Sequence, residues 1–176
     1  MLSWNNIAID DLKALADKSK VHPLTGLTNY QELWDRLTRL SRRQRDLPFS
    51  IIAIDLTGFK AINDTFGHQA GDAALCHVAE FFSSTIRSSD AIVCHPHGDE
   101  FLVVLMGSSA EEAKVVMSRL QTIPSFDFKG EKIQVGCALG SASASRVPTT
   151  LPVWQELLQQ ADLAMYEHKR TQSNAR

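Results

Sequence analysis

The spacing of apolar positions changes from segment to segment along the chain, and it predicts a mixture of helices and strands. Residues 28–43 carry Leu33, Leu37 and Leu40 at helical spacing, whereas residues 49–55 form a short apolar run typical of a strand buried on both faces. The same analysis predicts further helices over 57–64, 73–89, 108–123 and 152–170, and strands over 91–95, 100–106 and 126–142.

Local signals fix several ends of these elements. Ser109 and Glu112 form a capping box at one helix start, Thr57 is a candidate N-cap for another, and Pro148 or Pro152 stands near the start of the last helix. The segment Gly67–Asp72 is expected to break the chain between two helices, and Lys129-Gly130 to turn the final hairpin. Adjacent strands joined by short turns are antiparallel, so the fold class is α+β, with helices laid on a mostly antiparallel sheet.

The length of 176 residues is that of a single domain. Residues 1–20 predict a separate amphipathic helix, with Ile7, Leu12 and Leu15 on its apolar side, as an extra helix or the stub of a linker. This segment lacks the basic and apolar regions of a signal peptide. The main domain is expected to span residues 21–176.

Composition and charge narrow the class of function. The formal net charge is −2, from 18 basic and 20 acidic side chains, so no overall positive field indicates binding to nucleic acid or to a membrane surface. The basic run Arg39–Arg45 comes late in a helical pattern, where cations favour the helix dipole. No apolar stretch approaches the ~20 residues of a membrane span. The cysteines lie in apolar runs without C-x-x-C pairing, which favours a reducing cytoplasm: Cys76, Cys94 and Cys137.

Acidic residues at strand ends are the first candidates for chemistry. Asp55 ends an apolar strand, where a carboxylate is costly to desolvate unless it is paired, caps a helix or holds a cation. A hairpin tip beside that strand end would bring Asp99 and Glu100 close to it. Hard oxygen ligands of this kind suit Mg²⁺ together with water and phosphate. From Asp55 alone, the capping and metal interpretations stay open.

Four motifs stand in order along the chain: HPLTGLTNY, AIDLTGFKAINDTFGHQAGD, HGDEF and ADLAMYEHK. In this order and spacing they resemble the GGDEF family, the diguanylate cyclases, from His22 to about Lys169. The resemblance implies a fold like that of nucleotidyl cyclases and polymerase palms. It also implies the condensation of two GTP molecules into cyclic di-GMP with release of pyrophosphate, in a homodimer that brings two nucleotides face to face.

Roles for individual residues follow from the same resemblance. Asp55, Asp99 and the Leu56 carbonyl are implied ligands of Mg²⁺ or Mn²⁺, and Asp99 or Glu100 is implied to assist deprotonation of the attacking 3′-hydroxyl. Lys60 and Lys169 are implied phosphate ligands.

The guanine base is implied to bind between two helices. Asn63 and Asp72 correspond to guanine readers, and His68 lies in the same motif. Spacing alone also permits Asn63 as a helix C-cap and Asp72 as an N-cap. Phe59, Ile62 and Phe66 are assigned to packing.

Arg87 and Asp90 match the family's R-x-x-D site, which implies product inhibition by cyclic di-GMP. Here the site lies one residue farther than usual from GDEF. The alternative is an arginine that satisfies carbonyls at a helix end and an aspartate in a turn.

The chain departs from the family pattern at several positions. His22 replaces an Asp, His95 replaces the Arg of R-x-G-G-D-E-F, and His97 replaces its first Gly. Ser173 stands where an Arg usually follows Lys169, and Arg170 or Arg176 is a candidate substitute for that Arg. Thr57 stands where some members have a second acid. The imidazole of His97 is expected to obstruct the nucleotide, so His97→Gly should raise affinity and turnover. If the ring has instead been recruited to bind phosphate, the same change should lower activity below neutral pH.

Three alternatives to an active or weakly active cyclase follow from these departures. One is a degenerate module that binds GTP or cyclic di-GMP without turnover. Another is a metallohydrolase built on His95, His97 and Asp99. The third is an exposed turn that both histidines simply cap.

Overall fold

The computed structural model describes residues 20–43, 46–86 and 91–174. Residues 1–19 of the predicted N-terminal helix and the Arg87–Asp90 motif lie outside these residues. In chain order the elements are α2 (Tyr30–Arg42), β1 (Phe49–Thr57), α3 (Phe59–Phe66), α4 (His68–Thr85), β2 (Ala91–His97), β3 (Glu100–Met106), α5 (Ala110–Leu120), β4 (Phe126–Phe128), β5 (Glu131–Ile133), β6 (Gly136–Ala144) and α6 (Leu151–Asn174).

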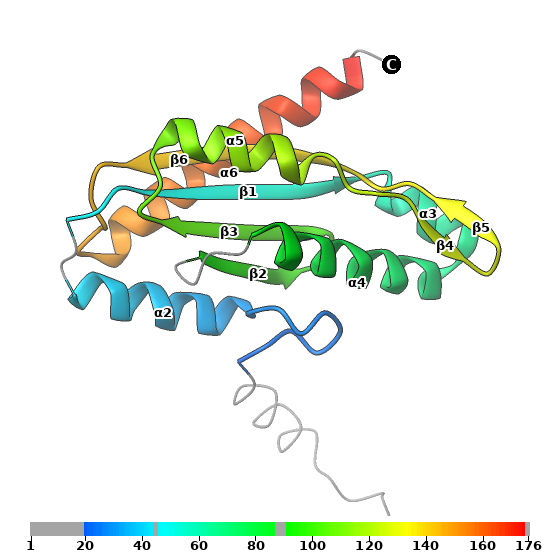
Figure 1. The fold of residues 1–176 in the computed structure, drawn as a ribbon, viewed down its shortest axis with the longest axis horizontal. Helices are drawn as coiled ribbons and strands as arrows, with labels where there is room; N and C mark the ends of the chain where they lie inside the picture. The colour runs from blue at the N-terminus through cyan, green and yellow to red at the C-terminus, as the bar shows by residue number, and fades with distance from the viewer. Residues whose placement is uncertain (1–19, 44–45, 87–90, 175–176) are drawn as a thin grey trace, which may run out of the picture.

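The centre of the molecule is a four-stranded antiparallel sheet in the order β2-β3-β1-β6. Helices α4 and α5 cover one face together with α3, and α2 and α6 cover the other, as Figure 1 shows. The expected α+β class with a mostly antiparallel sheet is confirmed.

Strand β1 explains why this sheet needs helices on both sides. Its residues from Phe49 to Leu56 are all buried, and successive side chains point to opposite faces. Ile52 and Ile54 pack with α4 and α5, whereas Ile51 and Ala53 pack with α2 and α6. By the same alternation Asp55 faces α6.

Two expectations about the ends of α3 are wrong. Thr57 belongs to β1, and the residue at the N-cap of α3 is Gly58, which makes no side-chain capping bond. The segment 67–72 is not a break, because α4 begins at His68 and only Gly67 separates it from α3. Two glycines within six residues are a loop signal, yet Gly71 lies inside the helix and packs closely against the Asn63 side chain.

The chain after α5 also differs from the expected single hairpin over 126–142. The turn at Lys129-Gly130 is confirmed, but it joins only the short strands β4 and β5. The second arm then separates, and β6 pairs along the whole of β1 as the edge strand of the main sheet. The capping box of Ser109 and Glu112 at the start of α5 is confirmed.

Burial corrects two further expectations. Cys94 and Cys137 are buried, but Cys76 is exposed, so only two of the three cysteines serve as small core residues. Phe66 is 40% exposed rather than packed, whereas Ile62 lies in the core. Within residues 20–43, 46–86 and 91–174, none of the helices combines the length and apolar character that a membrane span requires.

Candidate nucleotide site

The tip of the β2–β3 hairpin lies beside the end of β1. Asp55 and Glu100 are direct cross-strand neighbours, and the Leu56 N–H donates to the Asp99 carbonyl at 3.0 Å. Opposed residues of an antiparallel pair point to the same face, so Asp55 and Glu100 both face the α6 side. The expectation that the hairpin tip lies next to the end of this strand is therefore confirmed.

A lysine from α6 completes this corner of the sheet. Lys169 Nζ donates to Asp55 Oδ1 at 2.6 Å, and the Asp55 side chain is only 13% exposed. Helix α6 reaches this position because it packs directly on β6 at Gly140, where an added Cβ would collide with the helix backbone at Ala161 and Met165. A nearly buried carboxylate is thus compensated by a cation held at a fixed height above the sheet.

A cavity of about 380 Å³ opens next to this pair, and we call it the Lys169 cavity. Its volume is within the range of small-molecule sites. Two lysines and a carboxylate supply its charged groups, which suits a phosphorylated ligand accompanied by a cation. The lining residues are Leu56, Thr57, Gly58, Phe59, Lys60, Asp99, Lys169 and Gln172.

The donor set at this corner fits a hard divalent cation. Asp55, Asp99 and the main chain of Leu56 offer oxygens at one end of the sheet, and Mg²⁺ usually takes one or two protein carboxylates beside water and phosphate. In the part of the chain that the structure describes, no three His, Cys, Asp or Glu side chains form a ready-made cluster for a metal ion. A cation at this site would therefore depend on ligand oxygens as well as on protein oxygens.

The implied base-binding residues come together at the α3–α4 junction. Asn63 lies inside α3 and Asp72 inside α4, so neither is a helix cap, and the capping alternatives are wrong. The amide side chain of Asn63 lies against Gly71, where any Cβ would collide with it, and Gly71 precedes Asp72 directly. Asp72 and His68 are exposed. Hydrogen-bonding groups of both helices are thus presented at one junction.

The hairpin turn itself consists of Gly98 and Asp99. Gly98 has φ +58°, a conformation that favours glycine, and the hairpin closes with the pair His97–Glu100. His97 belongs to β2, and Lys129 is the single non-glycine residue with positive φ among the described residues. The replacement of the family's first glycine by histidine therefore brings no backbone strain.

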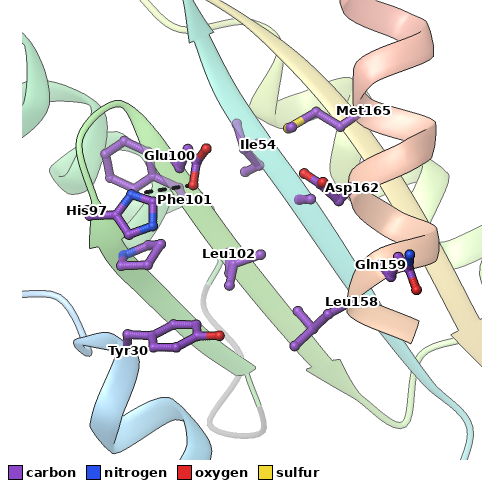
Figure 2. A pocket seen from close by; sticks show the side chains of 12 residues that line it. Tyr30, Ile54, His97, Glu100, Phe101, Leu102, Leu158, Gln159, Asp162 and Met165 are labelled. Carbon is purple, nitrogen blue, oxygen red and sulfur yellow. Dashed lines mark ion pairs between the residues drawn. The ribbon is translucent and has the colours of Figure 1, made fainter. Parts of the chain in front are cut away.

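The side chain of His97 lines a different cavity of about 370 Å³, which we call the Tyr30 cavity. Figure 2 shows His97 beside Glu100, with Tyr30 from α2 on one side and Asp162 and Met165 from α6 on the other. His97 Nδ1 lies 3.5 Å from Glu100 Oε2, and the His97 side chain is 74% exposed. The ring is not among the residues that line the Lys169 cavity.

His95 differs sharply from His97. It is fully buried, and both ring nitrogens lie within hydrogen-bonding distance of a partner: Nε2 of the Gly98 carbonyl at 3.0 Å, and Nδ1 of Thr25 Oγ1 at 3.1 Å. Burial lowers the pKa of His95, although the hydrogen bond with Gly98 acts in the opposite direction. The arrangement expected for a metallohydrolase is absent from the described residues, since His95, His97 and Asp99 form no metal-binding cluster.

Some residues of the site were not predicted from the sequence. Gln172 lines the Lys169 cavity, one helical turn beyond Lys169, and this i, i+3 spacing was the available signal. Thr25, in the loop before α2, contacts His95 through its hydroxyl, and the sequence offered no signal for this contact. Arg170 is exposed and does not line the cavity, while Arg176 lies outside the described residues.

Comparison with known proteins agrees with these observations. A family model described as "Diguanylate cyclase, GGDEF domain" matches residues 19–175. The chain is 35% identical over 163 residues to the diguanylate cyclase DgcP of Pseudomonas aeruginosa, covering 90% of this chain and 23% of that protein. It is 36% identical over 131 residues to the diguanylate cyclase DosC of Escherichia coli, covering 72% of this chain and 27% of the relative. The chain thus spans about a quarter of the length of these relatives.

The fold is similar to solved structures as well. The crystal structure of the diguanylate cyclase SiaD in complex with its activator SiaC, from Pseudomonas aeruginosa, matches with a TM-score of 0.78 at 29% identity, covering 92% of this chain and 62% of that chain. A sensory box/GGDEF family protein from Caulobacter crescentus matches with a TM-score of 0.75 at 29% identity, covering 87% and 99%. The chain therefore belongs to the GGDEF-domain family and has its nucleotidyl-cyclase-like α+β fold.

Proposed function

We propose that this chain is a diguanylate cyclase domain that condenses two GTP molecules into cyclic di-GMP and releases two molecules of pyrophosphate. The observation that carries this proposal is the Asp55–Lys169 pair at the Lys169 cavity, beside Lys60 and Asp99. It combines acidic oxygens for a cation with lysines for a triphosphate in one corner of the sheet. The names of the related cyclases support the same reaction.

Asp55, Asp99 and the Leu56 carbonyl would hold the divalent cation, Mg²⁺ or Mn²⁺. When bound, the cation neutralises triphosphate charge and favours ionisation of the 3′-hydroxyl. Lys60 and Lys169 would bind phosphate oxygens from the two sides of the cavity that they line.

In each half-reaction, the 3′-oxygen of one GTP forms a bond to the α-phosphorus of the other. The bond from that phosphorus to the pyrophosphate oxygen breaks, and the hydroxyl proton leaves. Asp99 or Glu100 would receive that proton, since both stand at the hairpin tip that faces the end of β1. Two such steps close the ring of the product.

Selection for guanine would come from the α3–α4 junction. The carboxylate of Asp72 can accept from N1–H and N2–H₂ of guanine, donors that adenine does not offer in that arrangement. Asn63 would bind the N3 edge, and His68 lies at the same junction. A site built for such donors rejects a base that leaves its own groups unpaired.

Catalysis would require a homodimer, because each chain offers one such site and each nucleotide must attack the other. A two-fold axis provides this reciprocal arrangement. Because two chains must meet, the specific rate should rise with protein concentration.

Cyclic di-GMP would bind as an inhibitor through Arg87 and Asp90, which lie outside the described residues.

A second candidate function is a non-catalytic module that binds GTP or cyclic di-GMP and signals through a partner. The observation that favours it is the replacement of the family's Arg, first Gly and second phosphate cation by His95, His97 and Ser173. It predicts nucleotide binding without release of pyrophosphate.

One experiment separates the two functions. The purified chain is incubated with GTP and Mg²⁺, and the products are resolved by chromatography, with ATP in place of GTP and EDTA in place of Mg²⁺ as controls. Formation of cyclic di-GMP from GTP alone, dependent on the cation, is the expected result. Binding of GTP in calorimetry with no cyclic di-GMP at any protein concentration would instead establish the non-catalytic module.

A further inference from the structure

We propose that His95 is a positioning residue, which fixes the turn Gly98-Asp99 through the Gly98 carbonyl and is itself anchored by the loop over residues 22–28. The catalytic consequence rests on the proposed function, because Asp99 matters for turnover only if the chain is a cyclase. The mechanical part concerns the folded chain alone and can be tested without activity.

The turn is held from two directions. On one side the Leu56 N–H donates to the Asp99 carbonyl at 3.0 Å, which ties the turn to β1. On the other side His95 Nε2 lies 3.0 Å from the Gly98 carbonyl. A two-residue turn with both carbonyls bound has little freedom to move Asp99 relative to Asp55.

The ring of His95 is in turn held by the loop. Thr25 Oγ1 lies 3.1 Å from Nδ1, and the ring centroid of His22 lies 3.9 Å from that of His95. On its other side the ring stacks on Phe101, with centroids 4.5 Å apart and an angle of 14° between the planes. The main chain adds a bond of 2.9 Å from the His95 N–H to the Thr28 carbonyl.

These partners determine where the proton lies. A carbonyl oxygen only accepts, so Nε2 carries the hydrogen and donates to Gly98. In the neutral ring Nδ1 then accepts from the Thr25 hydroxyl. Full burial favours this neutral form. The loop thus orients the ring, and the ring orients the turn.

The contact between His22 and His95 also relates two of the departures from the family pattern. The family's Asp would stand at position 22 and its Arg at position 95, and the structure places these two positions in contact. Both positions carry imidazoles here, and their rings touch with a tilt of 32° between the planes.

Three substitutions at position 95 separate shape from hydrogen bonding. His95→Phe keeps a flat ring against Phe101 but removes the donor. His95→Gln places an amide near the position of Nε2, whereas His95→Asn, one methylene shorter, reaches only the position of Nδ1. Gln and Asn therefore carry the same amide group, but only the Gln side chain is long enough to bring it to the Gly98 carbonyl.

Two readouts are measured on the full chain. Hydrogen exchange by mass spectrometry compares the hairpin peptide 94–101 with the β1 peptide 49–57. Steady-state kinetics with GTP and Mg²⁺ compare kcat with KM. We expect faster exchange in the hairpin alone for Phe and Asn, and a fall in kcat of about 10- to 100-fold with KM changed less than about threefold, because the base binds elsewhere. His95→Gln should keep both the hairpin exchange and kcat close to those of the parent.

The outcomes are distinguishable. Hairpin exchange in His95→Phe equal to that of the parent, or a loss equal in Gln and Asn, would overturn the proposal. If the parent makes no cyclic di-GMP, the proposed function fails, and hairpin exchange alone decides the positioning role. If His95→Phe does not fold, Thr25→Val against Thr25→Ser tests the same link from the loop side, with faster hairpin exchange expected for Val only.

Discussion

The two sides of the β2–β3 hairpin have changed to very different extents. The side that faces β1 and α6 retains the acids and the lysine that the family resemblance implies, with Asp99 near Leu56 and Asp55 paired to Lys169. On the side that faces the loop over residues 22–28, His95 of the hairpin and His22 of the loop replace charged residues of the family pattern. The proposed ligands Asp55, Asp99 and Lys169 are thus kept, whereas the two positions proposed to support the turn carry imidazoles in place of charged side chains.

The strongest test of this contrast removes a carboxylate on the retained side. Asp55→Asn or Asp99→Asn should lower turnover by about 100-fold or more, because triphosphate charge would lose its compensating cation. Asp64→Asn, on the exposed side of α3, is the matched control and should leave the rate unchanged. Rates are measured as cyclic di-GMP formed, and thermal unfolding checks the fold. Near-parental activity of either variant would show that the metal assignment is wrong.

A smaller effect is expected at the cation on α6. Lys169→Met should lower kcat/KM by about 10-fold or more, since the phosphate loses a charged donor. Arg170→Met changes the neighbouring exposed residue, which does not line the cavity, and should have no effect. Equal losses in both variants would indicate a general effect of charge rather than a contact. Lys169→Arg should recover part of the activity.

Two adjacent positions at the hairpin tip, His97 and Gly98, offer a matched pair of substitutions. Gly98→Ala should destabilise the fold by about 1–2 kcal/mol, because φ at this residue is positive. No atom lies near enough to clash with the added Cβ, so the backbone conformation accounts for the whole effect. His97→Gly should destabilise it by about 0.5–1 kcal/mol through strand entropy. Its effect on kcat/KM should be smaller than that of Lys169→Met, because the ring lines the Tyr30 cavity. Urea unfolding and GTP kinetics measure both. A large gain in GTP affinity would support obstruction by the imidazole instead.

The smallest effect is a dependence of stability on pH. Burial lowers the pKa of both His22 and His95 in the folded protein, and His97 and His22 add to the effect on His95. As pH falls through 6.5, the ordinary pKa of histidine, these side chains bind protons in the unfolded chain but not yet in the folded chain. The free energy of unfolding therefore decreases below that pH.

Urea unfolding from about pH 7.5 to about pH 5.5 measures this loss, in a window above the ordinary range of carboxyl groups. The double variant His22→Asn/His95→Gln should show a flatter profile than the parent. A parental profile that rises toward low pH would contradict the assignment of neutral rings.

Periodicity predicted most of the framework, since helical spacing at Leu33 and Leu37 and the apolar run of β1 are local properties. It failed at the start of α4, where the sequence shows glycines and the structure shows close packing of Gly71 on Asn63. Local patterns carry no information about which neighbouring helix a glycine will touch. The separation of β5 from β6 was not predicted for the same reason, because only the pairing of β6 with β1 distinguishes the two strands.

In the candidate site, too, contacts between residues far apart in the sequence were not predicted. The family resemblance named Asp55 and Lys169 separately, but their direct pairing joins residues 114 positions apart and depends on the height of α6 above β6. The contact that supports the turn was not predicted, because Thr25 and His95 are 70 positions apart and lie in separate motifs. Contacts of this range are products of the fold, so a single sequence does not display them.

The strand order also has a consequence for synthesis of the protein on the ribosome. Strand β1 is almost wholly apolar and central, but its two neighbours, β3 and β6, follow it along the chain, and β6 comes last. Until residues 136–144 have emerged, one edge of β1 has no partner within the sheet, and an open apolar edge favours association between nascent chains. Chains truncated before β6 should therefore aggregate during translation, and early capture of β1 by a chaperone should raise the yield.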